Sequence, residues 1–266
     1  MRTTNGMTRL SLADQTDAAG LAAFLTRQLK WDRAAAVRLR ASGDGVLAAF
    51  GRPARFEVLA VRTSRLVPTV ADADADADAD VGPAEDVPGA TAASSSPGPA
   101  PAAGPPAELD ATVSAGQLLD GIDEQTATLT VPPPVTGPSW AGMLPPRGQW
   151  RRVAEPSLAE VRAEAGAVVA EFRSRSEALR HTERTRAALD ALAEEIWNRP
   201  LPGTSLPLRA VHAAHALGFL QPVGGVPVDE VPVPVLAAGP WLRLRTPHGS
   251  TAVRGAGRPG LSLTPL

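Results

Sequence analysis

The 266-residue sequence has no cysteine, no tyrosine and a single lysine, Lys30. The absence of cysteine excludes disulfides, thiolate metal sites and cysteine nucleophiles, and it suits a reducing compartment. Arginine takes the place of lysine, and alanine, glycine and proline are abundant. This bias is typical of a GC-rich bacterial genome, so the arginine content alone does not indicate nucleic-acid binding. With only five phenylalanines and five tryptophans, the cores must be built from leucine, valine and alanine.

Long apolar runs are also missing. No segment reaches the roughly 18 apolar residues of a membrane span, and residues 1–6 lack the apolar stretch that a secretory signal needs. We therefore predict a cytoplasmic protein without membrane contacts.

Motifs of catalysis and metal binding are absent as well. The sequence contains no P-loop, no dinucleotide-binding fingerprint and no H-E-x-x-H zinc motif. Ser139 lies between Gly137 and Gly142, but the second glycine comes one residue too late for a G-x-S-x-G nucleophile elbow. His212 and His215 have a spacing that metal ligands sometimes use, but no cluster of further ligands accompanies them. We predict that the protein is not an enzyme and that it binds no metal or cofactor.

Charge is distributed unevenly along the chain. Residues 1–66 carry a net charge of +6, residues 67–135 carry −12 without a single base, and residues 150–266 carry +3. The acidic part includes five consecutive Ala-Asp repeats at 71–80, followed by a Pro/Gly/Ala/Ser tract. Such a composition cannot bury enough apolar surface to offset the entropy of ordering it. We predict a disordered acidic insertion at about residues 68–107.

The remaining residues predict an α+β fold with two modules. The first module, residues 8–135, carries the insertion between its third and fourth strands, and a smaller domain that ends at residue 67 is the alternative. Because long loops cost little extra entropy, we expect the fold to survive deletion of residues 70–107. Helices are expected at 18–31, capped by Asp17, and at 115–122, and strands at 36–40, 46–50, 56–61, 109–113 and 126–131.

The strand at 36–40 alternates with period two, which places Arg38 and Arg40 together on the face opposite the apolar residues. Arg62 and Arg65 on the third strand would extend this basic face. A sheet that binds single-stranded nucleic acid also interleaves aromatic residues for base stacking, and these strands have few. The alternative is a solvated face without a ligand.

A proline-rich linker at residues 136–150 joins the modules, in a break that begins at Pro132. Six prolines exclude a regular helix there, and the segment is expected to run extended over the surface. Its two tryptophans, Trp140 and Trp150, are expected to attach it to a folded module.

The second module, residues 151–266, is predicted to be mainly helical and to end in a β-hairpin. Ser157 followed by Glu160 forms a capping-box pattern directly before an apolar run. A second helix follows, and its buried side is expected to carry Leu179, Leu189, Leu192, Ile196 and Trp197. A shorter third helix at 204–217 and a hairpin at 241–254 come after it. This order matches a winged helix-turn-helix domain, in which the third helix enters the major groove and the hairpin contacts the backbone.

Arginines support the winged-helix interpretation, and the third helix argues against it. Arg243, Arg245 and Arg254 cluster in the hairpin, where phosphate contacts would be useful. On the third helix, Arg209 stands among alanine, valine and leucine, a composition more typical of a packed helix than of one that reads bases.

We therefore predict a non-catalytic binding or regulatory protein that acts through contacts with a protein partner. The sequence does not identify the partner or the oligomeric state. The alternative is a nucleic-acid-binding regulator, and a steep salt dependence of DNA binding would distinguish it. Its candidate contacts with nucleic acid or another polyanion are Arg38, Arg40, Arg209, Arg243, Arg245 and Arg254.

Overall fold

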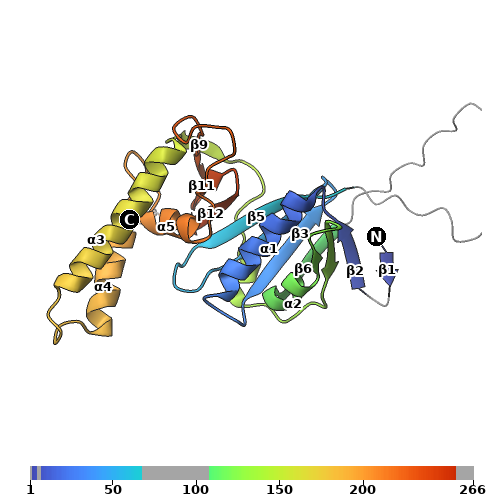
Figure 1. Cartoon of the computed structure of the whole chain (residues 1–266), viewed down its shortest axis with the longest axis horizontal. Coiled ribbons are helices and arrows are strands. Elements are labelled where there is room, and N and C mark those ends of the chain that lie inside the picture. Colours follow the sequence, from blue (N-terminus) through green and yellow to red (C-terminus); the bar gives the residue numbers. More distant parts are fainter. Residues whose placement is uncertain (1, 5–6, 68–107, 256–266) are drawn as a thin grey trace, which may run out of the picture.

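The computed structural model describes residues 2–4, 7–67 and 108–255 of the chain. The acidic insertion predicted at about 68–107 lies outside these residues. Within the described part, an eight-stranded antiparallel sheet runs through both halves of the molecule in the order β6-β3-β4-β5-β12-β11-β10-β9 (Figure 1). Its strands are β3 (Ala36–Ser42), β4 (Val46–Gly51), β5 (Leu59–Arg65), β6 (Glu108–Ser114), β9 (Arg151–Ala154), β10 (Val235–Ala238), β11 (Trp241–Thr246) and β12 (Gly249–Arg254).

The two halves of the chain meet where β5 pairs with β12. Val61 lies opposite Ser250, and Ala60 lies opposite Thr251. Strand β6 also belongs to this sheet, because it pairs with β3 along its whole length. The strands before and after the predicted insertion are therefore part of one sheet.

Helix α1 (Gln15–Leu29) covers one face of the first half of the sheet. Its apolar stripe, which includes Phe24, is buried against the strands as its spacing predicts. The predicted cap is wrong by three residues. Asp14, and not Asp17, is the N-cap, because its carboxylate accepts a hydrogen bond from the backbone N–H of Asp17 at 2.8 Å.

A smaller sheet stands beside α1 and α2 (Ala115–Asp120). Among the described residues its strand order is β1-β2-β8-β7. Leu129 of this sheet and Leu118 of α2 are fully buried in the same core as α1. The strands are β1 (Arg2–Thr4), β2 (Met7–Ser11), β7 (Ile122–Asp123) and β8 (Thr128–Val131).

Three helices belong to the second half: α3 (Leu158–Ala178), α4 (Arg186–Trp197) and α5 (Leu208–Ala216). The predicted capping box at the start of α3 is confirmed. Helices α3 and α4 lie side by side at one end of the molecule (Figure 1). Helix α5 lies on the sheet, where the buried Thr251 hydroxyl donates to the backbone oxygen of Ala210 at 2.9 Å. No helix within the described ranges is long and apolar enough to cross a membrane.

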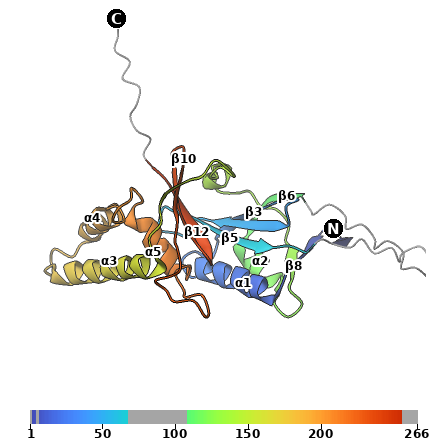
Figure 2. The same cartoon turned by 90° about the horizontal axis from the view of Figure 1, so that it is seen from above.

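Helices α1 and α5 cover the same face of the large sheet (Figure 2). Phe24 of α1 stacks on Phe219, which follows α5, with ring centroids 5.8 Å apart. The linker crosses the other face. The guanidinium of Arg38 donates to the backbone oxygen of Ala141 at 2.6 Å, and the guanidinium of Arg243 on β11 lies over the ring of Trp150. The linker includes one short 3-10 turn, η1 (Ser139–Gly142). The expectation that Trp150 attaches the linker to a folded module is thus confirmed.

The fold is α+β, as predicted, but the winged-helix-like arrangement is not confirmed. The predicted hairpin forms as β11 and β12. Both strands of the hairpin are interior strands of the large sheet, because β12 also pairs with β5 and β11 also pairs with β10. The C-terminal end of the described chain is therefore mostly sheet.

Candidate binding cleft

Five of the six predicted arginine sites share one face of the large sheet, the face opposite to α1 and α5. The sixth, Arg209, lies on α5 and therefore on the opposite side. In β3 and β11 the residues that alternate with the arginines are buried or half-buried under the helices. The five arginines are Arg38 and Arg40 on β3, Arg243 and Arg245 on β11, and Arg254 on β12.

The two arginines of β3 are engaged within the protein. Arg38 donates to both carboxylate oxygens of Asp110, at 2.8 and 3.0 Å. These hydrogen bonds lower the pKa of Asp110 below its usual value. Arg40 lies 3.4 Å from the same carboxylate. One acid thus faces two arginines, and Arg38 also holds the linker through Ala141.

The hairpin arginines differ in exposure: Arg243 is half-buried, and the other two are exposed. Arg243 donates to the hydroxyl of Ser250 at 2.7 and 2.9 Å and lies over the ring of Trp150, 5.6 Å from its centroid. Burial lowers the pKa of Arg243. Arg245 and Arg254 are exposed. Arg243 therefore fixes the linker, and Arg245 and Arg254 are the hairpin arginines that a polyanion could reach.

The predicted basic face does not include Arg62. Arg62 pairs opposite Ala49, a core residue, so its side chain points to the helix side of the sheet. There it packs against Gly20 of α1 and donates to the backbone oxygen of His248 at 2.5 Å. That part of the prediction is wrong.

A cleft of about 1160 Å³ opens on the helix side, where the two halves of the chain meet. The first half contributes Trp31, just after α1, and the β4–β5 loop, residues 52–58. The second half contributes side chains of α3, α4 and α5. The cleft therefore exists only where both halves are folded together.

A row of five aromatic side chains lies along this cleft. Trp31 contacts Phe56 edge-on at 5.2 Å between ring centroids, and Phe56 contacts His212 edge-on at 5.2 Å. His212 stacks on Trp197 at 4.2 Å, and Trp197 lies 5.9 Å from Phe172. Edge-to-face and offset-stacked pairs each contribute about 0.5–1.5 kcal/mol beyond burial. The row passes from one half of the chain to the other between Phe56 and His212.

His212 belongs to this row as a neutral ring. Burial lowers its pKa to about 4, with a smaller contribution from nearby His215. At neutral pH the imidazole is therefore uncharged, which suits its position between Trp197 and Phe56. His215 is exposed at the end of α5. The structure uses His212 for packing, and the two histidines do not share a site.

Arg209 joins the two sides of the cleft. Its Nη1 donates to Glu57 of the β4–β5 loop at 2.6 Å, and its Nη2 donates to Glu194 of α4 at 3.2 Å and also to Asn198. The side chain of Arg209 is 16% exposed. An arginine predicted to read bases is thus part of an ion-pair network in the cleft wall.

The β4–β5 loop holds Phe56 in the row by an unusual backbone. Arg55 has φ 77° and Glu57 has φ 53°. Non-glycine residues in this region cost about 1–3 kcal/mol each and concentrate at functional sites. Because of these left-handed residues, β5 begins at Leu59, and the predicted strand 56–61 is displaced toward the C-terminus.

Sequence reasoning did not predict this cleft. It placed Phe56 on a strand and Trp197 on the buried side of a helix. The available signal was the scarcity of aromatic residues, because each of the few phenylalanines and tryptophans then stands out as a candidate for a site. In the structure, Trp31 and Phe56 lie outside the helices and strands.

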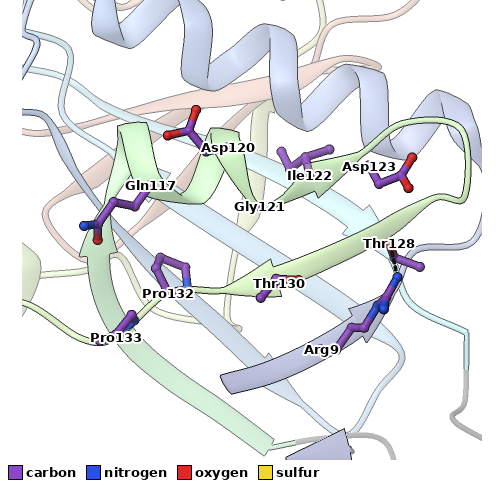
Figure 3. A pocket seen from close by; sticks show the side chains of 10 residues that line it. All are labelled: Arg9, Gln117, Asp120, Gly121, Ile122, Asp123, Thr128, Thr130, Pro132 and Pro133. Atoms are coloured by element: carbon purple, nitrogen blue, oxygen red, sulfur yellow. Dashed lines mark hydrogen bonds between the residues drawn. The ribbon is translucent and has the colours of Figure 1, made fainter. Parts of the chain in front are cut away.

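A second depression, of about 600 Å³, lies over β2, β7 and β8 next to α2 (Figure 3). Its labelled side chains point in different directions. Arg9 donates to Thr128 at 3.0 Å. The Asp123 carboxylate accepts hydrogen bonds from the side chain and backbone of Thr126, which lower its pKa. These polar groups serve their own strands and turns, so the aromatic cleft is the better candidate site.

Comparison with known proteins gives two family matches. A family model described as a domain of unknown function, DUF8185, matches residues 145–258. Another, described as a domain of unknown function, DUF8010, matches residues 6–142. A search of curated proteins found no match. The aromatic cleft is lined by residues of both matched segments. Because its match covers more than half of the sequence, the DUF8010 family is the one to which this chain belongs.

Proposed function

We propose that this protein is a non-catalytic binding or regulatory protein, and that it acts by holding a segment of a protein partner in the aromatic cleft. The observation that carries the proposal is the row from Trp31 to Phe172, built by both halves of the chain. Aromatic side chains supply most of the binding energy where partner segments lie in grooves. A site shared by two halves also gives a reason for their common sheet.

The dimensions of the cleft favour a polypeptide over a small metabolite. Pockets for small molecules enclose about 300–1,000 Å³ and bury most of their ligand. The cleft holds about 1160 Å³ and extends from the end of α1 to α3 and α4. A peptide segment fits such a length, and its backbone can remain partly in solvent.

The chemistry of the cleft favours binding over catalysis. A general base needs a pKa near the working pH, whereas burial lowers the pKa of His212 to about 4. Its ring contacts Trp197 and Phe56, and the nearest acids are engaged with Arg209. These groups hold the cleft together and have no arrangement of nucleophile and base.

The alternative proposal is a nucleic-acid-binding regulator that uses the face of the large sheet opposite to α1 and α5. Its support is the shared position of five arginines, of which Arg245 and Arg254 are exposed. It is the weaker proposal, because Arg38, Arg209 and Arg243 are engaged in contacts within the protein.

Two serines on α3 provide a matched test. Ser176 lines the cleft, whereas Ser174 is exposed and lies outside it. We would select linear peptides from a displayed random library against the full chain and measure their affinities for both variants. Ser176→Trp should abolish binding by filling the cleft, and Ser174→Trp should leave it unchanged.

Peptides that bind equally to both variants would overturn the cleft as the binding site. Failure to select any peptide, together with DNA binding that weakens steeply between low and moderate salt, would favour the nucleic-acid alternative. Thermal unfolding of both variants controls for loss of the fold.

A further inference from the structure

The acidic side chains of the cleft are already paired with arginines of the protein. Glu57 and Glu194 both pair with Arg209, at 2.6 and 3.2 Å. Asp190 lies 3.6 Å from Arg186, one turn away on α4. The three carboxylates and their two arginine partners leave a net charge of −1, which the two remaining arginines of the cleft outweigh.

Two arginines of the cleft have no such partner. Arg55, on the β4–β5 loop, and Arg173, on α3, both line the cleft and are exposed. No carboxylate of the described ranges lies within 4 Å of either guanidinium. They come from different halves of the chain, so an occupant of the cleft meets a free positive charge from each half.

The floor between these charges is apolar. Phe56, next to Arg55, packs against His212, and Phe172, next to Arg173, packs against Trp197. An occupant must therefore present an apolar or aromatic group to the floor and negative charge to the rim. Small apolar ligands would satisfy only the floor.

We propose that the cleft recognises an acidic peptide segment with an aromatic anchor, whose carboxylates pair with Arg55 and Arg173. The inference rests on the proposed function and adds the chemical class of the partner. The anchor supplies most of the affinity, as buried aromatic residues do at interfaces. The rim charges add selectivity and speed of association, and salt weakens their effect.

The test uses synthetic peptides with one central tryptophan and three kinds of flanks: Asp/Glu, Asn/Gln and Lys. Affinity for the full chain is measured at low and moderate salt. We expect the acidic peptide to bind about tenfold more tightly than the neutral peptide at low salt, and the basic peptide to bind most weakly. The preference should shrink at moderate salt.

Charge reversal tests whether Arg55 and Arg173 cause the preference for acidic peptides. The double variant Arg55→Glu/Arg173→Glu should lose the preference for acidic flanks or invert it. Arg52→Glu is the matched control, because Arg52 is an exposed arginine of the same loop that does not line the cleft. It should keep the native preference.

The outcomes distinguish failure of the acidic preference from failure of the proposed function. If all three peptides bind equally and Ser176→Trp still abolishes binding, the acidic preference is overturned and the proposed function stands. If none of them binds in a way that Ser176→Trp removes, both fail. Binding of N-acetyltryptophanamide as tight as that of the acidic peptide would also overturn the inference, because the occupant would then be a small molecule.

Discussion

His212 shows how one residue of the cleft links packing to pH. Its pKa in the folded state is about 4, mainly because of burial, whereas an unfolded histidine has its pKa near 6.5. Above pH 6.5 the ring is neutral in both the folded and the unfolded state, so it does not change the free energy of unfolding with pH. Between pH 6.5 and 4 the unfolded chain binds a proton that the folded chain excludes, so stability falls. The loss is on the order of 3 kcal/mol.

We therefore expect His212→Phe to unfold with less pH dependence than the native protein. The phenyl ring keeps the stacking on Trp197 but cannot be protonated. Urea unfolding at pH 7 and pH 4.5 measures the difference. His215→Gln, which changes the exposed histidine of the same helix, is the control and should retain most of the native pH dependence. An unchanged pH dependence in His212→Phe would show that the ring is not buried as described.

Phe172 has a different place from the one its spacing predicts. Leu158, Val161, Ala165, Val168 and Phe172 follow one another at spacings of three and four residues. This spacing predicts that Phe172 belongs to the core stripe of α3 and that its truncation costs roughly 3–5 kcal/mol. In the structure it is half-buried and lines the cleft beside Trp197. We now expect Phe172→Ala to cost about 1–2 kcal/mol.

The comparison is Ile196→Ala, because Ile196 of α4 is fully buried. It should cost about 4 kcal/mol in urea unfolding. Arg162→Ala on the exposed side of α3 removes one hydrogen bond, to the backbone oxygen of Leu220 at 3.1 Å, and should cost about 1 kcal/mol. Equal losses for Phe172→Ala and Ile196→Ala would place Phe172 in the core after all.

At the scale of elements, the start of α3 is the clearest case of local control. The hydroxyl of Ser157 accepts a hydrogen bond from the backbone N–H of Glu160 at 3.2 Å, and the Glu160 carboxylate accepts one from the N–H of Ser157 at 2.7 Å. Ser157→Ala should therefore lower the free energy of unfolding by about 1 kcal/mol. Ser157→Asp should restore most of it, and a neutral effect of both substitutions would mean that the box contributes nothing.

Elements of this kind could be predicted from the sequence because their signals are local. The capping box, the alternation in β3 and the Gly43–Gly45 turn each depend on residues within a few positions. The turn needs positive φ at both glycines, and they have φ 83° and 71°. The α+β class and most helices followed from such patterns.

The parts of the fold that could not be predicted depend on contacts between residues far apart in the sequence. Strands β9 and β10 are four residues each and have no alternation of their own to reveal them; they form because they extend an existing sheet edge. The β5–β12 pairing joins residues almost 200 positions apart. The cleft depends on that pairing, because it brings Phe56 next to His212. No local pattern could have predicted it.

At the scale of the whole molecule, the strand order decides how the insertion can be shortened. Arg65 at the end of β5 lies opposite Val46, and Glu108 at the start of β6 lies opposite Ser42. Strands β4 and β3 stand between them, so the chain must span three strand spacings, about 14 Å. Deleting residues 70–107 leaves four residues for this span. Leu66 and Val67, the first two of the four, are held by backbone hydrogen bonds to Gly45 and Ser11.

Outright deletion should therefore strain the sheet, in contrast to the expectation from loop entropy alone. The four remaining residues reach about 17 Å when fully extended, so they cross the gap only in a nearly straight path that releases Leu66 and Val67 from their hydrogen bonds. A ten-residue Gly/Ser replacement has an r.m.s. length of about 17 Å and spans the gap without strain. We expect it to raise stability by about 1 kcal/mol, because the shorter loop costs less closure entropy. The outright deletion should melt several degrees below the native chain. Equal melting temperatures for the deletion and the replacement would contradict the order β6-β3-β4-β5, and a replacement that melts lower than the native chain would assign residues 70–107 a part in the fold.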